Sequence, residues 1–265
     1  MKFKIWKTGL VVSGVVLGVI GTAKTADASG FAILEQGVKG LGNAYAEGAT
    51  TSEDASAIFF NPAGLTQFTG TSVVTGGYLI APSIEFNNQG SSQFGAPLRG
   101  RESGEFAPNK IVPNFYAAWD LGSRVKAGIG VNSPFALATD YPSGWIGRYQ
   151  ALRSSLLTIN INPAIAAKIS KDFSIGAGLN LQYADAKLSN EIDFGTIGRR
   201  FGLSTLPQGA DGSLDVQGED WSVGYNVGLL YAPSRSTRIG LAYRSGIKHE
   251  LEGRARFTVP TSAAA

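Results

Sequence analysis

Large apolar residues alternate with small or polar residues along most of the chain after Gly70. Between Trp221 and Tyr231 the odd-numbered positions are apolar or aromatic, and most even-numbered positions are Ser, Gly or Asn. A period of two places such residues on opposite faces of a β-strand. Similar alternation occurs in residues 124–132, 156–169, 173–183 and 238–248. The pattern predicts an all-β protein.

The two strand faces differ in a way that separates a membrane barrel from a soluble sandwich. Arg238, Arg244 and Lys248 share a face with small and polar residues, whereas the large apolar residues occupy the other face. A soluble β-sandwich strand also alternates, and it remains the alternative for any one strand taken alone. An apolar outer band with aromatic borders around a polar interior is typical of a transmembrane antiparallel β-barrel. Its repetition over several strands favours the barrel.

The connection lengths support the same architecture. Short turns alternate with connections of roughly twenty to thirty residues, as expected when turns face the periplasm and loops face outward. Bacterial single-chain barrels have an even number of strands, but only seven are predicted here. The first and seventh strands would each leave an unpaired edge in lipid. We therefore expect residues 71–265 to be the N-terminal part of a longer barrel that does not insert stably alone. Seven strands are predicted, near residues 71–86, 111–121, 124–133, 154–170, 172–190, 221–232 and 237–256.

The segment of residues 29–70 is rich in glycine and alanine and lacks sustained alternation. We predict two short helical pieces in it, near residues 34–46 and 52–59. Pro62 cannot donate to a helix ladder and Gly64 permits a tight reversal, so the second piece should end at this point. A segment with so little apolar bulk cannot build a core of its own. We expect it to pack inside a larger structure.

The N-terminus predicts export. Three lysines precede an uncharged run over residues 8–23, and Ala26-Asp27-Ala28 follows as a cleavage site. This is the layout of a secretory signal peptide, and the apolar run is short for a membrane-spanning helix. Removal of residues 1–28 takes away four lysines and one aspartate, so the formal net charge falls from +3 to 0. The basicity therefore says nothing about nucleic-acid or acidic partners.

Composition narrows the chemistry. The chain has no cysteine, 35 glycines and only 16% charged residues, so disulfide or zinc chemistry is disfavoured. No spacing of metal ligands and no phosphate-binding loop is recognisable, and we predict neither a metal nor a cofactor. An enzyme embedded in a barrel would have only His249 for Ser/His hydrolysis, and that residue is expected to be solvated. We predict that the protein is not an enzyme.

Several short motifs resemble the FadL/TodX family of outer-membrane transport proteins for hydrophobic compounds. They are Ser-Gly-Phe at residues 29–31, Gly-Leu-Gly-Asn-Ala at 40–44, Asp-Ala-Ser at 54–56 and Asn-Pro-Ala-Gly-Leu at 61–65. Later segments agree, including Gly-Glu-Asp-Trp at 218–221 and Tyr-Arg-Ser at 243–245. The resemblance implies a fourteen-stranded barrel of the Gram-negative outer membrane, with residues 29–70 as a hatch that plugs the lumen.

The resemblance also implies a function, namely passive uptake of long-chain fatty acids or similar apolar molecules. Outer loops would capture the compound, a shift of the mature N-terminus would open a path, and exit would be lateral. Uptake of monoaromatic hydrocarbons by the same route and a general diffusion porin remain the alternatives. The expected partners are hydrophobic small molecules, outer-membrane lipid and the barrel assembly machinery, with a monomer as the expected state.

The hatch and the third strand contain the residues that the resemblance singles out for gating and exit. Phe31 stands at the inserting N-terminal position, or it is a packing residue of the hatch. Asn61, Pro62 and Ala63 are expected to hold the hatch fold rather than to touch the compound. A lateral opening is placed at the third strand, where glycines and a proline weaken pairing, although ordinary interior glycines are the alternative. The opening is assigned to Gly128, Gly130 and Pro134.

Two further groups of residues are candidates for ligand contact. Parity places Arg244 and Lys248 in the lumen, where a buried carboxylate would need a cation, unless lumen acids such as Glu250 pair with them. Lys187 is closer to the expected family contact, but its parity places it outward. The connection over residues 133–153 is apolar enough for ligand capture or for packing against other loops. Its capture candidates are Phe135, Leu137, Trp145 and Tyr149.

Overall fold

We analysed a computed structural model in which residues 32–50, 53–93, 95–102, 107–234 and 236–261 are described. All of them belong to one compact unit, Phe31–Ala265. The predicted signal peptide and the gating candidate Phe31 lie outside the described residues. No helix within the described ranges is long and apolar enough to cross a membrane.

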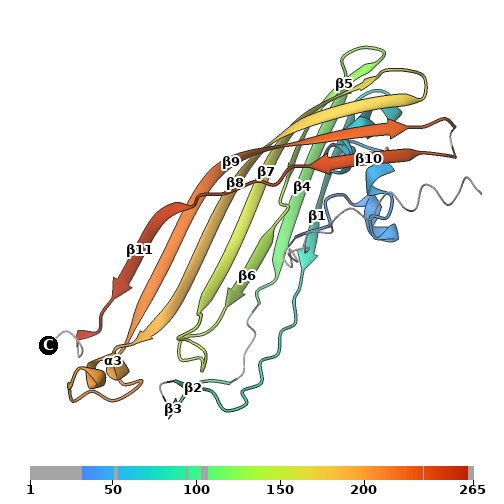
Figure 1. Ribbon diagram of the computed structural model, residues 1–265. Helices are drawn as coiled ribbons and strands as arrows, with labels where there is room; N and C mark the ends of the chain where they lie inside the picture. The colour runs from blue at the N-terminus through green and yellow to red at the C-terminus, as the bar shows by residue number, and fades with distance from the viewer. Residues whose placement is uncertain (1–31, 51–52, 94, 103–106, 235, 262–265) are drawn as a thin grey trace, which may run out of the picture. The chain divides into compact units, whose positions relative to one another are not determined.

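Antiparallel strands form a curled sheet in which neighbours in sequence are mostly neighbours in space (Figure 1). The confirmed alternation of apolar and polar positions allows each strand to present two different faces. Two short strands extend the sheet, since β6 (Ala136–Asp140) pairs with β7 and β11 (Glu252–Thr258) pairs with β9. The main order is β1 (Ser72–Ile80), β4 (Lys110–Asp120), β5 (Val125–Asn132), β7 (Arg153–Lys168), β8 (Phe173–Asp193), β9 (Asp211–Tyr231) and β10 (Ile239–Arg244).

The predicted alternation of short and long connections is present. The short connections are residues 121–124, residues 169–172 and the one between β9 and β10, and they lie at one end of the sheet in Figure 1. The long connections lie at the other end and contain β2 (Ser92–Gln93), β3 (Ala96–Pro97) and α3 (Phe194–Arg200). The sheet is therefore the curled half-barrel that the sequence pattern predicted.

Three strand boundaries differ from the prediction. The first strand ends at Ile80 because Ala81 is followed by Pro82, which has no N–H for a ladder. β9 begins at Asp211 because β8 supplies partners along its whole length, up to Asp193↔Asp211. The last strand is interrupted over residues 245–251. This stretch contacts β9 through the Ser245 N–H, which donates to the Tyr225 carbonyl oxygen (2.9 Å), and through the Lys248 carbonyl oxygen, which accepts from Ser222 Oγ (2.6 Å).

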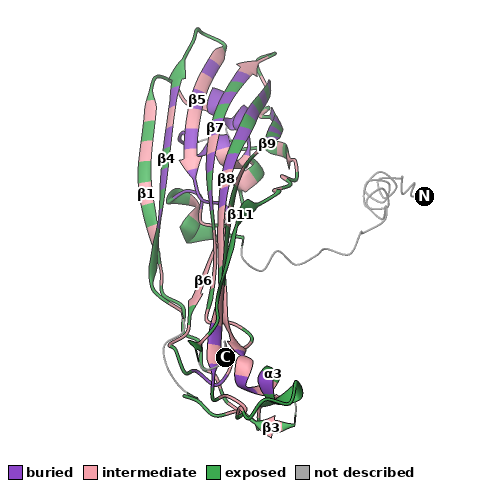
Figure 2. Cartoon of the chain, turned by 90° about the vertical axis from the view of Figure 1, so that its left-hand side faces the viewer, coloured by how far each residue is buried: buried purple, intermediate pink, exposed green. Residues whose placement is uncertain are grey.

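Residues 32–50 and 53–70, which we call the hatch segment, pack against one face of the sheet. This segment contains η1 (Lys39–Asn43), η2 (Gly48–Thr50), α2 (Ala57–Phe60) and η3 (Pro62–Gln67). We call the sheet face that contacts it the inner face, and the opposite face the outer face. Figure 2 shows how buried and exposed positions alternate along the strands, because one face is covered and the other is open.

The secondary structure of the hatch segment is shorter than predicted. Residues 34–46 do not form an α-helix, and only Lys39–Asn43 forms a 3₁₀ turn. Glycine is a poor helix former, and Ala44 and Tyr45 adopt the left-handed backbone conformation (φ 53° and 60°), which ends the turn. The second piece is one α-helical turn, Ala57–Phe60, followed by Pro62 as predicted.

The hydrophobic core lies between the hatch segment and the inner face. Ile58 and Leu65 are fully buried there, and Tyr116 is the largest buried side chain of the sheet. Small residues complete this core on both sides, which lets backbone approach backbone closely. They are Ala55 and Ala57 in the hatch segment and Ala118, Ala164 and Ala166 in the sheet.

Candidate functional site

Glycines on the inner face form the surface on which the hatch segment rests. A Cβ added at Gly176 would lie 2.9 Å from the Pro62 carbonyl oxygen and still closer to Ala63, and one at Gly228 would overlap Asn61. Only a residue without a side chain allows this approach. The glycines of the predicted lumen face therefore provide the contact area for the hatch.

The same reason explains Gly128 and Gly130, which were predicted to weaken the third strand. A Cβ at Gly128 would lie 2.7 Å from Ile58, and one at Gly130 would lie 2.8 Å from the Tyr116 ring. Both glycines are paired in register with β4 and with β7. Close packing accounts for them, and the strand is not interrupted at either position.

The third predicted strand is interrupted a few residues further along the chain, at Ser133 and Pro134. Pairing between β4 and β5 stops at Phe115↔Val131, and the chain resumes as β6, which pairs only with β7. Residues 110–114 of β4 then keep β1 as their paired neighbour among the described residues. The N-terminal end of the hatch segment lies against this break, because the Ile33 N–H donates to the Pro134 carbonyl oxygen (2.9 Å).

Asn61 ties the hatch segment to the sheet. Its Nδ2 donates to the carbonyl oxygens of Ala49 (2.6 Å) and Leu229 (3.0 Å), and its Oδ1 accepts from the Ala63 N–H (3.0 Å). Asn61, Pro62 and Ala63 are all completely or nearly completely buried. One carboxamide thus caps η3 and also links the hatch segment to β9.

We expect Asn61→Ala in the full-length protein to lower the free energy of unfolding by about 1–3 kcal/mol, because buried partners lose their hydrogen bonds. Thermal unfolding in detergent measures the change. Asn43→Ala is the matched control, since Asn43 belongs to the same segment but bonds Glu47 and Tyr45 in an exposed position. Equal destabilisation by both substitutions would contradict the role of Asn61.

Arg244 projects from β10 onto the inner face. Its Nη2 donates to the Phe59 carbonyl oxygen (2.7 Å), its Nη1 donates to Asn180 Oδ1, and its guanidinium lies 4.3 Å from the centre of the Phe59 ring. No ion pair joins Arg244 to an acidic residue within the described ranges. A guanidinium has five N–H donors, so this cation can accept a further anionic partner.

The other two predicted cations are placed differently. The Lys248 side chain is 84% exposed and pairs with Glu250 (2.6 Å), which corrects its placement as a buried lumen charge. The last predicted strand is interrupted here, between β10 and β11, so parity no longer decides where Lys248 points. Lys187 pairs with Asp185 (3.1 Å), two residues away on the same strand face. Arg244 is the only one of the three that the fold places against the hatch segment.

His249 is half-buried and hydrogen-bonded at both ring nitrogens, whereas the prediction placed it in solvent. Its Nδ1 lies 2.9 Å from Asp220 Oδ2 and its Nε2 lies 3.0 Å from Gln182 Oε1. The segment that interrupts the last strand bends over the inner face and brings the imidazole to β8 and β9. No group of three His, Cys, Asp or Glu side chains in the described part of the chain is arranged to hold a metal ion.

The predicted capture residues divide between loop packing and the strand break. Trp145 is 6% exposed and stacks on Tyr141, with ring centres 3.8 Å apart. The Tyr149 hydroxyl donates to Asp211 (2.7 Å), and burial raises the pKa of this phenol above its ordinary value. Phe135 and Leu137 are half-buried at the break and in β6. Trp145 also packs against Phe86 of another loop, with ring centres 5.4 Å apart, whereas Tyr149 is bonded to the start of β9.

Several inner-face asparagines are candidate site residues that the sequence pattern did not indicate. A hydrogen-bonded row runs across β5, β7, β8 and β9 from the hatch segment to Arg244. Each asparagine occupies an inner position of its strand, so parity placed them on one face. Nothing in the sequence reports that they meet at one height. The row consists of Gln36, Asn132, Asn160, Asn180 and Asn226.

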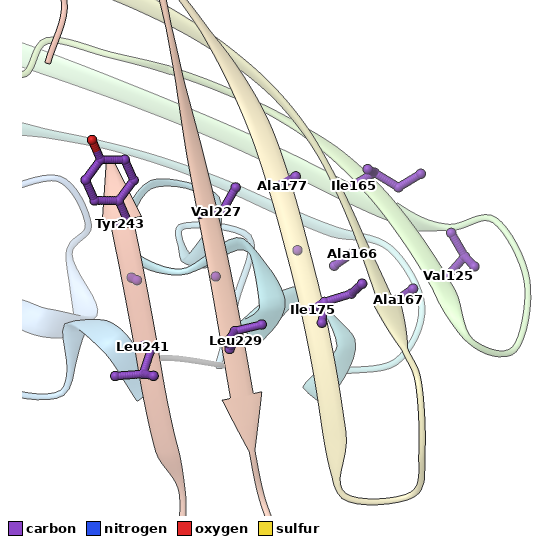
Figure 3. A pocket seen from close by; sticks show the side chains of 13 residues that line it. Val125, Ile165, Ala166, Ala167, Ile175, Ala177, Val227, Leu229, Leu241 and Tyr243 are labelled. Carbon is purple, nitrogen blue, oxygen red and sulfur yellow. The ribbon is translucent and has the colours of Figure 1, made fainter. Parts of the chain in front are cut away.

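An apolar groove lies on the outer face, where β5, β7, β8, β9 and β10 contribute its lining (Figure 3). Its volume is about 670 Å³. Ile165, Ile175, Ala177 and Leu229 are among the residues that line it. Exposed apolar side chains continue along the same face, as expected of a wall in contact with lipid. The groove therefore belongs to the membrane-facing surface.

Two curated outer-membrane proteins are similar to the chain in sequence. The chain is 30% identical over 261 residues to a putative outer membrane protein of Neisseria meningitidis serogroup B, covering 94% of this chain and 56% of that protein. It is 26% identical over 261 residues to the long-chain fatty acid transport protein of Escherichia coli O6:H1, covering 93% and 57%. The chain thus spans little more than half the length of these relatives.

A solved structure shows the same fold. The crystal structure of a Pseudomonas aeruginosa FadL homologue superposes with a TM-score of 0.73 at 20% identity, covering 86% of this chain and 55% of that one. The sequence profile of the family described as outer membrane protein transport protein (OMPP1/FadL/TodX) matches residues 19–265. The chain is an outer-membrane protein and belongs to the OMPP1/FadL/TodX family of transport proteins.

Proposed function

We propose that the full-length protein takes up hydrophobic compounds passively across the outer membrane, and that its compounds carry a carboxylate, as long-chain fatty acids do. The observation that carries this proposal is Arg244, a cation on the inner face whose described partners are neutral oxygens and an aromatic ring. Membrane proteins rarely keep a charge in such a position without a functional partner. A carboxylate would match the guanidinium in charge and geometry.

The hatch segment supports gated rather than open passage. Residues 54–66 are almost all buried against the inner face, and Asn61 bonds the segment to β9. An open diffusion porin needs a water-filled lumen, whereas the inner face at this height is covered. We propose that residues 29–70 form the plug and that a compound passes after this segment shifts.

We place the lateral exit at the break after Asn132, between β4 and β6. Residues 110–114 of β4 lose their β5 partner there, and the N-terminal end of the hatch segment lies against the same break through Ile33 and Pro134. An unpaired strand edge facing lipid is costly, so a covered interruption that can open is a suitable exit. Pro134, rather than Gly128 or Gly130, marks this place.

Radiolabelled uptake tests the proposal most directly. A strain that lacks its own transporter is complemented with the full-length gene, and oleate uptake is compared with toluene uptake. We expect oleate to accumulate well above the empty-vector strain, because Arg244 can bind its carboxylate. Toluene uptake without oleate uptake would assign an uncharged aromatic compound instead. Uptake of neither compound would refute the transport function.

A further inference from the structure

A continuous row of buried carboxamides crosses the inner face at the height of Arg244. Gln36 Oε1 accepts from Asn132 (2.6 Å), and Asn160 donates both to Asn132 and to Asn180 (3.1 Å each). Asn180 then donates to Asn226 Oδ1 (3.2 Å). All five side chains are at most 2% exposed. They connect β5, β7, β8 and β9 without a gap.

One end of the row holds the N-terminal part of the hatch segment at the strand break. Gln36 Nε2 donates to the Ile33 carbonyl oxygen (3.0 Å) and to the Ser133 carbonyl oxygen (2.9 Å). Ile33 in turn is bonded to Pro134 through its N–H. The carboxamide of Gln36 therefore joins the hatch segment to the point where β5 ends.

The other end of the row holds the helical turn α2. Asn226 Nδ2 donates to the Ile58 carbonyl oxygen (3.0 Å), and Arg244 donates to the Phe59 carbonyl oxygen (2.7 Å). Arg244 also donates to Asn180 Oδ1, which accepts from Asn160 at the same time. The Asn180 carboxamide is thus the junction between the cation and the row.

The row behaves as a unit because none of its members has access to water. A buried carboxamide that loses a partner cannot replace it with solvent, so the cost appears in the network rather than being relieved locally. Hydrogen bonds in such chains also polarise one another. Loss of the Arg244 donor at Asn180 Oδ1 therefore alters the hydrogen bonds that Asn180 makes with Asn160 and with Asn226.

We propose that the carboxamide row couples the Arg244 site to the N-terminal end of the hatch segment at the strand break. This inference rests on the proposed function in one respect, because the carboxylate of the compound is the group that would draw Arg244 away from Asn180 and Phe59. The loss of that donor weakens the row, and Gln36 loosens its hold on Ile33 and Ser133. Asn132, Asn160, Asn180 and Asn226 are then positioning residues that transmit occupancy.

A cycle of substitutions measures this coupling without any ligand. The 265-residue sequence contains no cysteine, so Ile33→Cys in the full-length protein places a single thiol at a buried position of this chain. Its rate of reaction with a maleimide in detergent reports how often the N-terminal end leaves the break. We compare the parent, Arg244→Gln, Asn160→Ala and the double variant.

We expect Arg244→Gln to raise the labelling rate about fivefold or more, the effect of about one lost hydrogen bond. Asn160→Ala should raise it similarly, and the double variant should label no faster than the faster single variant, because the row is already broken. An unchanged rate in Arg244→Gln would overturn the coupling. The coupling would also be overturned if Arg244→Gln raised the labelling rate by the same factor in the parent and in Asn160→Ala.

Asn114→Ala is the matched control for loosening of the fold. Asn114 is a buried inner-face asparagine of β4 whose side chain has no hydrogen-bond partner among the described residues. We expect parental labelling from it, and labelling as fast as that of Asn160→Ala would overturn the specific role of the row. If Asn160→Ala does not fold, Asn160→Ser takes its place in the cycle, with the same expected result.

An oleate arm separates this inference from the proposed function. Oleate should accelerate labelling of Ile33→Cys in the parent but not in Asn160→Ala. Oleate affinity that does not change in Arg244→Gln would refute the proposed function, while the ligand-free cycle would still decide the coupling. Equal acceleration by oleate in the parent and in Asn160→Ala would overturn the row as the route of transmission.

Discussion

Replacement of Arg244 by glutamine in the full-length protein is expected to weaken oleate binding by about 10- to 150-fold. Charge-assisted hydrogen bonds contribute about 1.5–3 kcal/mol each, and glutamine keeps donors but loses the charge. Binding of a fluorescent or radiolabelled fatty acid to the purified protein measures the change. Oleyl alcohol, which has the same chain but no carboxylate, should bind both proteins equally.

Lys248→Gln is the control for this experiment. Lys248 follows closely in sequence and has the same charge, but its side chain is 84% exposed and pairs with Glu250. An exposed ion pair contributes little, so oleate affinity should remain at the parental value. A comparable loss of affinity in both variants would indicate a general attraction of the fatty acid to positive charge and would contradict a site at Arg244.

Gly176→Ala is expected to displace the hatch segment and to open the barrel. The added Cβ would collide with the backbone of Pro62 and Ala63, and backbone cannot move aside as a flexible side chain can. Overpacking of this kind costs about 1–3 kcal/mol. It should raise the fraction of molecules whose hatch segment is displaced from the inner face by about 5- to 150-fold. Conductance of the full-length protein in planar bilayers should become larger and more persistent than that of the parent.

The matched control for hatch displacement is Gly122→Ala. A Cβ at Gly122, in the turn between β4 and β5, would meet no atom within 4 Å. Conductance of this variant should match the parent, because neither the hatch segment nor the sheet must adjust. If Gly176→Ala also conducts like the parent, the hatch segment does not close the barrel at β8.

The strands could be predicted because a sheet with lipid on one side leaves a local signal. Side-chain parity alone places Val223 and Tyr225 outward and Asn226 inward, as the structure confirms. Turn lengths depend on neighbouring residues and were predicted equally well. Loops were not, because β6 forms by pairing with β7, and β9 extends only because β8 supplies a partner.

The interruptions of the sheet show where local pattern ceases to decide. Gly128 and Gly130 were expected to weaken β5, yet their role depends on Ile58 and Tyr116, which are remote in sequence. His249 was expected to face water. It contacts Asp220 and Gln182 instead, because the last strand bends inward, and the local sequence does not indicate this bend. The residue type is the same whether a glycine weakens a strand or packs closely against another segment, and whether a histidine is solvated or hydrogen-bonded. Only the tertiary contacts distinguish these cases.

The signal peptide, the alternation of strand faces and the end of the helical turn before Pro62 could be predicted from the sequence, because each depends on residues a few positions apart. The tertiary structure decided which of three candidate cations faces the hatch segment, and it joined five carboxamides into one row. The reason is physical, since hydrogen bonds between strands depend on register. Register is set by pairing over the whole sheet, and no short stretch of sequence contains it.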